Sequence, residues 1–184
     1  MTVLTSLRWL DNFRASVNAT DVSRQEGSNV DIVASPDGAG NGELALCHLS
    51  GLIPFTLGDD VAWMPAFEDA ASVALAAHHL NVGDGSIVPE VKGLNERCKI
   101  RFTIEFADTQ LDGGTSLKTI VDQTNREPHT SERLPCAFLG AYMSDISIAT
   151  SIVTGLLGYP QISGASTSAN LDDPGQYPLF GRSM

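Results

Sequence analysis

Two kinds of hydrophobic pattern follow one another along the chain from Glu43 onwards. Between Cys98 and Asp108, apolar residues alternate with mostly polar ones, which is the period of a β-strand. Other short apolar runs are bounded by turn residues and also predict strands. The predicted strands cover residues 44–54, 99–108, 136–141 and 160–164.

Apolar residues at helical spacing fill the segments between these strands. Predicted helices cover residues 65–80, 114–124 and 144–157. Pro65 and Asn81 fit the two ends of the first helix, while Ser144 and Gly158 fit the two caps of the third. The apolar stripe of the second helix consists of Leu117, Ile120 and Val121.

This order of elements predicts the fold class. Strands and helices alternate as β-α-β-α-β-α-β, which favours an α/β fold with a doubly wound parallel sheet and helices on both faces. Residues 1–42 are polar and rich in turn residues, so we interpret them as a poorly structured N-terminal tail. The predicted domain therefore covers residues 43–184.

Composition narrows the classes of function. The chain has 184 residues, 42% of them hydrophobic, which is enough for one domain with a sizeable core. Its formal net charge is −11 and no basic cluster interrupts the acidic residues, which argues against a nucleic-acid partner. No run of 18 apolar residues occurs, and the first residues lack the apolar stretch of a signal peptide.

The cysteines and histidines indicate neither a metal nor a cofactor. Cys47, Cys98 and Cys136 fit no metal spacing and no dense disulfide scaffold, and buried free thiols are the simplest interpretation. His78 and His79 lie on a predicted helix, and neither has a second ligand four residues away. Because no nucleophile has an oriented base as its partner, we predict that the chain is not an enzyme.

Three loops that follow predicted strands carry candidate ligand-binding residues. In open parallel sheets, ligands bind at the carboxyl ends of the strands. Ser144 begins a helix there, and helix N-termini attract carboxylates; Thr167 follows the next strand, and Trp63 lies in the first loop, where an indole can stack on a ligand. Each also has a structural interpretation: a cap for Ser144, a turn around Thr167, and core packing for Trp63.

Beyond these patterns, residues 44–184 resemble an incomplete first lobe of the receptor ligand-binding region. The resemblance rests on GLIPF and AASVALAAHHLN, on FLGAYMSDISIA, and on the closing stretch PQISGASTSANLDDPGQYPLFGR. This family has the type I periplasmic-binding-protein fold, in which two lobes close around a ligand. Its members include class C G-protein-coupled receptors, natriuretic peptide receptors and bacterial amino-acid-binding proteins, and the chain is most similar to type B GABA receptors.

The resemblance implies a set of ligand-binding residues. Trp63 stands at the place of a ligand-contacting tryptophan, Ser144 at that of a serine that holds the ligand's carboxylate, and Thr167 at that of the hydroxyl residue that follows it. Ala165 and Ser166 complete the predicted set. Ala165 replaces a serine of the glutamate-type receptors, which argues against strict glutamate geometry.

Some positions depart from the family. Asp145 follows Ser144 where a small polar residue is usual; it either repels a ligand carboxylate or simply favours the helix dipole. Gly181 replaces an aromatic residue. The family's cysteine pattern is not reproduced, although Cys47 and Cys98 lie on predicted strands that could be adjacent, which leaves a bond between them open.

The resemblance implies a ligand-binding ectodomain fragment of a membrane receptor, on the extracellular side, for a small amino-acid-like ligand. The complete receptor would resemble type B GABA receptors and signal through G proteins. Its implied partners are the ligand, a second lobe with a membrane domain, and a second copy bound through the first lobe. The alternatives are a soluble solute-binding protein of an amino-acid transport system and a guanylate cyclase ectodomain similar to natriuretic peptide receptors.

Overall fold

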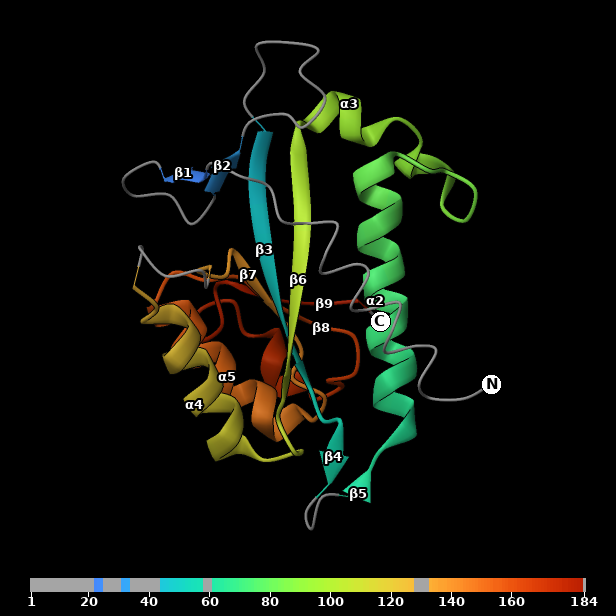
Figure 1. Ribbon diagram of the computed structural model, residues 1–184. Coiled ribbons are helices and arrows are strands. Elements are labelled where there is room, and N and C mark those ends of the chain that lie inside the picture. Colours follow the sequence, from blue (N-terminus) through green and yellow to red (C-terminus); the bar gives the residue numbers. More distant parts are fainter. Residues whose placement is uncertain (1–21, 25–30, 34–43, 58–60, 128–132, 184) are drawn as a thin grey trace. The chain divides into compact units, whose positions relative to one another are not determined.

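Figure 1 shows a computed structural model of the chain, which describes residues 22–24, 31–33, 44–57, 61–127 and 133–183. The chain forms two compact units. The first comprises Met1–Leu46 with Val73–Thr103, and the second comprises Cys47–Ser72 with Ile104–Met184. The boundary crosses two strands and one helix, so these elements contribute to both units.

The described residues contain nine strands and six helical segments. The strands are β1 (Val22–Arg24), β2 (Asp31–Val33), β3 (Leu44–Ile53), β4 (Thr56–Leu57), β5 (Val61–Ala62), β6 (Ile100–Asp108), β7 (Ala137–Leu139), β8 (Gln161–Ser163) and β9 (Phe180–Arg182). The α-helices are α2 (Met64–Val82), α3 (Leu94–Cys98), α4 (Gly113–Thr124) and α5 (Ser144–Leu156), and the 3-10 helices are η1 (Pro89–Val91) and η2 (Ala169–Asp172).

The fold class predicted from the sequence is confirmed. Strands β6, β3, β7, β8 and β9 form a parallel sheet in that order, and helices flank it. The register pairs Ser50 with Phe138, Leu139 with Ile162, and Ile162 with Gly181. The architecture is therefore that of a doubly wound α/β fold.

In the second unit, helices cover both faces of the sheet, as alternating side chains of β3 show. Leu52 packs with Ile120 of α4 and with Phe138, whereas Ile53 packs with Ala66 and Ala70 of α2. Successive residues of a strand point to opposite faces, so two neighbours reach two separate cores. Within this unit, α4 and α5 lie on one side of the strands and the first half of α2 lies on the other (Figure 1).

Helix α5 packs on the sheet through hydroxyl groups as well as apolar ones. Thr150 and Thr154 are fully buried, and both bond to the side chain of Gln161 on β8, with atom distances of 2.9 and 3.1 Å. Gln161 also donates to the carbonyl of Gly140 at 2.8 Å. No buried side-chain oxygen or nitrogen among the described residues lacks a partner, so this polar interior is satisfied.

Several local predictions differ from the structure. The N-cap of α5 is Met143, and the Ser144 side chain bonds elsewhere. Val121 is 43% exposed, and the buried face of α4 consists of Ser116, Ile120 and Gln123, so the predicted apolar stripe was wrong at Val121. Helix α2 extends to Val82, beyond the predicted end.

Asn81 has a different role from the predicted one, and it acts within the first unit. Its side-chain amide donates to the carbonyl of Phe102 and accepts from the Phe102 N–H, both at 2.7 Å. The residue therefore joins α2 to β6 instead of ending the helix. The helix ends before Gly83, whose φ of 66° is one that glycine adopts readily.

The cysteine prediction is corrected as well. Cys47 on β3 and Cys136 directly before β7 form a disulfide with a Cα–Cα distance of 5.3 Å, and Cys98 is free and exposed at the end of α3. Free buried thiols and a bond between Cys47 and Cys98 are both excluded. The bonded pair lies where β3 and β7 are neighbours in the sheet, which sequence spacing did not reveal.

Two short strands lie in the segment for which the sequence predicted little structure. Strands β1 and β2 pair antiparallel, and β2 pairs antiparallel with the start of β3. The rest of the predicted tail lies outside the described residues. Of the helices that the structure describes, none combines the length and the apolar character needed to cross a bilayer.

Candidate functional site

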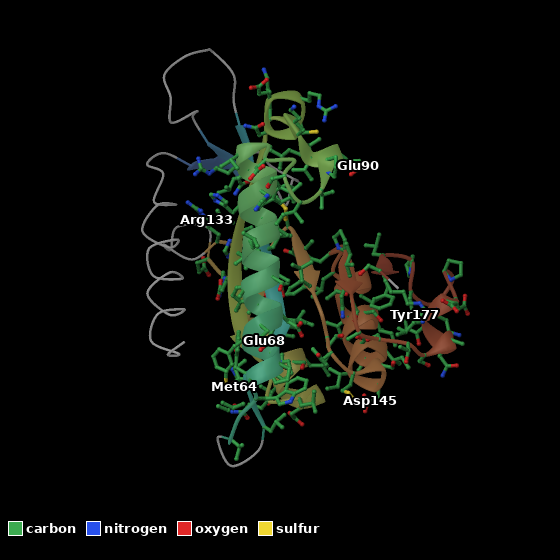
Figure 2. All side chains as sticks on the ribbon, turned by 90° about the vertical axis from the view of Figure 1, so that its right-hand side faces the viewer. Met64, Glu68, Glu90, Arg133, Asp145 and Tyr177 are labelled. Atoms are coloured by element: carbon green, nitrogen blue, oxygen red, sulfur yellow. A yellow bond between two sulfur atoms is a disulfide. The ribbon has the colours of Figure 1, made fainter. Side chains whose placement is uncertain are left out.

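The carboxyl ends of three parallel strands gather the candidate residues in the second unit. Strands β3, β7 and β8 end at Ile53, Leu139 and Ser163, and the following loops carry the sequence-predicted positions. Figure 2 labels Met64 and Asp145, which mark the beginnings of α2 and α5 toward the lower end of the view. Both helices thus begin at the strand ends where ligands of such sheets bind.

Ser144 and Thr167 are brought together by hydrogen bonds. The Ser144 Oγ accepts the N–H of Thr167 at 3.0 Å and the N–H of Ser168 at 3.1 Å. A hydroxyl oxygen has two lone pairs and one proton, so Ser144 keeps its O–H as a donor. The Ser144 oxygen therefore holds the loop after β8 in place, and the hydroxyl hydrogen of the same residue can still be donated to a ligand.

The first turn of α5 offers backbone N–H groups to a ligand. The first four N–H groups of a helix have no partner within the helix. The N–H of Ile146 is taken by Asp145 Oδ1 at 2.9 Å, and that of Ser147 by the carbonyl of Met143 at 2.9 Å. The N–H groups of Ser144 and Asp145 thus point out of the helix start, next to the Ser144 hydroxyl.

Asp145 fits the helix-dipole role predicted for it, and its charge would also act on a ligand carboxylate bound at the same helix start. Its carboxylate accepts an N–H of its own helix, which places negative charge at the positive end of the helix dipole. The side chain is exposed. The same negative charge weakens the attraction of this helix start for a second carboxylate.

Ser166 and Ala165 lie in the loop after β8, on the side that faces α5. Ser166 is fully buried, and its hydroxyl bonds to Ser147 Oγ at 2.7 Å and to Ser163 Oγ at 3.0 Å. The N–H of Ala165 donates to Ser163 Oγ at 3.2 Å. These contacts hold the loop against α5, so we expect both residues to position Thr167 and Ser168 while the exposed Thr167 reaches solvent.

Trp63 is both a core residue and an edge residue. Its half-buried ring packs against the cluster of Ile53, Ala66 and Ala70. Its other contact is with Tyr142, at a centroid distance of 4.8 Å and an interplanar angle of 77°, an edge-to-face arrangement. Tyr142 stands two residues before Ser144, so it connects the tryptophan to the helix start.

Sequence reasoning missed Tyr142, whose ring contacts Trp63, and the acidic residue Asp69. Asp69 lies on α2 and is one of the groups that act on the titration of the Tyr142 hydroxyl. Burial raises the pKa of Tyr142 above its usual value, and the neighbouring Asp69 charge adds to this, so the phenol stays protonated. The available signal was the position of Tyr142 in a strand-to-helix loop and of Asp69 in the first turns of the helix after Trp63.

Metal chemistry finds no support in the part of the chain that the structure describes. No group of three or more histidine, cysteine, aspartate or glutamate side chains gathers there in a way that could hold an ion.

A comparison with models of known protein families gives no match, and no curated protein matches the chain.

Proposed function

We propose that the chain is a lobe of a receptor ligand-binding domain and that it takes the carboxylate of a small amino-acid-like ligand. The observation that carries the proposal is the pair of hydrogen bonds from Thr167 and Ser168 to Ser144 Oγ. They bring a helix start, a serine O–H and an exposed threonine to one edge of the sheet. These are the groups that a carboxylate needs.

The donors at the start of α5 are suited to binding a ligand. Donors that are already fixed in place bind an anion without the entropy cost of ordering them. Each hydrogen bond to a charged group stabilises binding by about 1.5–3 kcal/mol. In a two-lobed domain, closure of an opposing lobe would add further contacts and exclude water, so the chain alone is expected to bind weakly.

The disulfide supports the proposed location on the extracellular side of a membrane. Structural disulfides persist in oxidising compartments and are rare in the cytosol. Cys47 and Cys136 are bonded within the sheet that positions the site. In the proposed receptor, a second lobe, a membrane domain that signals through G proteins and a second copy of this lobe are the partners.

Removing the Ser144 hydroxyl is expected to weaken carboxylate binding about tenfold or more. One charge-assisted hydrogen bond is lost, and about 1.4 kcal/mol corresponds to one decade in affinity. The measurement is titration of the ¹⁵N-labelled chain with alanine and with 4-aminobutanoate, followed by amide shifts at Ser144, Asp145, Thr167 and Ser168. Ser144→Ala and Thr167→Ala are compared with the wild type.

Ser72→Ala is the matched control. Ser72 is exposed, belongs to the same unit, and its hydroxyl bonds only to the carbonyl of Glu68 in its own helix, at 2.9 Å. Ser144→Ala could weaken binding simply by displacing the loop that Ser144 Oγ holds. Thr167→Ala tests the site without this effect, because it removes only a side chain and leaves the backbone hydrogen bonds to Ser144 Oγ in place. Equal affinity of all three variants and the wild type would contradict the proposal.

Asp145→Asn is expected to strengthen carboxylate binding by roughly two- to fivefold. A charge at a helix N-terminus contributes about 0.3–1 kcal/mol, and here it opposes the ligand's own charge. The asparagine can still accept the N–H of Ile146, so the helix start is kept. The same titration measures the change in affinity. The change should shrink at high salt, because exposed charges are screened. An unchanged or weaker affinity of Asp145→Asn would show that Asp145 does not repel the ligand.

A further inference from the structure

Arg182 of β9 contacts the loop that carries Thr167 and Ser168. Strands β8 and β9 are parallel neighbours in the sheet (Figure 1), and the register pairs Ser163, the last residue of β8, with Arg182, the last residue of β9. The loop after β8 begins at this point, at the carboxyl ends of the strands. Arg182 therefore belongs to the same edge of the second unit as the proposed carboxylate site.

The guanidinium of Arg182 has two partners in this loop. Its Nη1 donates to the carbonyl oxygen of Ser168 at 3.0 Å, and its Nη2 donates to the carboxylate of Asp172. Ser168 is the N-cap of η2 and Asp172 is its last residue. The planar fork of an arginine suits two acceptors at once, so one side chain of β9 ties both ends of η2 to the sheet.

Ser168 is held by two side chains, one at its N–H and one at its carbonyl. The N–H donates to Ser144 Oγ at 3.1 Å, and the carbonyl accepts from Arg182 and, at 3.2 Å, from the N–H of the buried Leu171. The N–H groups of Thr167 and Ser168 occupy the lone pairs of the Ser144 hydroxyl and so fix the direction of its O–H. Arg182 thus acts on the Ser144 donor through Ser168.

The charge of Arg182 is balanced within the loop. Of the ion pairs among the described residues, Lys118 pairs within α4 and Arg126 pairs with β6, whereas Arg182 pairs with Asp172. The Arg182 side chain is 20% exposed and that of Asp172 is 60% exposed. Because a carboxylate already neutralises the guanidinium, the pair is better suited to holding the loop than to attracting an anion.

We propose that Arg182 and Asp172 form a clamp on the loop after β8, which makes Arg182 a positioning residue of the carboxylate site. The clamp keeps the N–H groups of Thr167 and Ser168 on Ser144 Oγ. A loop that is ordered before the ligand arrives costs less entropy on binding, so the clamp raises the affinity. The effect on affinity rests on the proposed function, whereas the hold on the loop can be measured without a ligand.

The first measurement is hydrogen exchange of single amides in the ¹⁵N-labelled chain without a ligand. Arg182→Gln should speed exchange at Thr167 and Ser168 about tenfold, because local opening of the loop becomes easier. Asp172→Asn should speed it less, since the bond from Arg182 to the Ser168 carbonyl remains. Amides in the middle of α5 serve as the internal reference and should keep their rates.

The second measurement is the titration with alanine and 4-aminobutanoate. Arg182→Gln should weaken the binding of both about five- to tenfold. Arg182→Lys keeps the charge but presents one nitrogen in place of a fork, so it should recover only part of the affinity and of the exchange protection. Lys118→Gln is the matched control, because Lys118 is exposed, belongs to the same unit and its loss changes the net charge equally; both measurements should stay at the wild-type values.

The outcomes are distinct. Unchanged exchange at the loop in Arg182→Gln overturns the clamp, as does full recovery in Arg182→Lys, which would show that the charge alone acts. Equal acceleration of loop and α5 amides, with a lower unfolding temperature, would indicate a general loss of stability and also overturn it. Faster loop exchange with unchanged affinity overturns the positioning role. If loop exchange is faster but the wild type binds neither ligand, the carboxylate proposal fails and the clamp stands.

Discussion

Replacing Cys47 and Cys136 together with alanine is expected to lower the free energy of unfolding by about 4–5 kcal/mol. The bond joins residues that are 89 positions apart. A cross-link over so long a loop restricts the unfolded chain strongly, and by the chain-entropy model the stabilisation grows with the logarithm of loop length. Urea unfolding of the double variant and of the wild type, each in a Cys98→Ala background, measures the difference.

Two observations accompany this prediction. Thiol titration of the unfolded wild type should find one free thiol without a reductant and three with it, because Cys98 is the unbonded cysteine. Cys98→Ala alone should change stability by less than about 0.5 kcal/mol, since the residue is exposed. Three titratable thiols before reduction, or a double variant as stable as its background, would contradict the assignment.

Glu105→Gln is expected to lower the free energy of unfolding by about 3 kcal/mol near neutral pH. Glu105 accepts two hydrogen bonds of 2.7 Å from the Arg126 guanidinium and lies 3.2 Å from His48 Nε2. The Arg126 side chain is only 12% exposed, so the substitution removes a negative charge that faces a nearly buried cation. Urea unfolding at pH 7 gives the size of the effect.

The effect of this substitution should depend on pH. The hydrogen bonds from Arg126, then that from His48, hold the pKa of Glu105 well below its usual value of 4.5. The unfolded chain therefore binds more protons than the folded one as the solution is acidified below about pH 4.5. The stabilisation is complete above that pH and is lost as the pH falls, so the difference between wild type and Glu105→Gln should shrink in acid.

The exposed pair of Lys118 and Asp122 supplies the control. Both side chains are more than half exposed and stand four residues apart on α4. Exposed pairs of this kind contribute about 0.3–0.5 kcal/mol, so Asp122→Asn should have a small effect at every pH. If Glu105→Gln and Asp122→Asn lowered the free energy of unfolding equally, the effect would come from the change in net charge and not from the contacts of Glu105.

The alternation and the short apolar runs of the sequence predicted the parallel strands β3, β6, β7 and β8, because these patterns depend only on residues that are close along the chain. Leu52 and Ile53 belong to one apolar run, and their division between two cores follows from strand geometry alone. Strands β4, β5 and β9 are two or three residues long, too short to show a period, and none was predicted.

Contacts between distant segments could not be predicted in the same way. The bond between Cys47 and Cys136 depends on β3 lying next to β7, which is a property of the sheet order. The ring pair of Trp63 and Tyr142 joins the loop before α2 to a loop far along the chain, and neither residue type indicates a partner by itself. Ser144 and Thr167 were predicted to lie together from the carboxyl-end rule for parallel sheets, because that rule links loops through topology.

The hydroxyl groups between α5 and β8 have a mechanical consequence. Apolar side chains tolerate small slips past one another, whereas hydrogen bonds are directional and are lost within fractions of an ångström. Gln161 is tied to Thr150 and Thr154, and Ser166 to Ser147, so helix, strand and loop share one set of such bonds. We therefore expect α5 and the loop that carries Thr167 to move as one rigid body, so that a force on the helix start is transmitted to β8 with little loss.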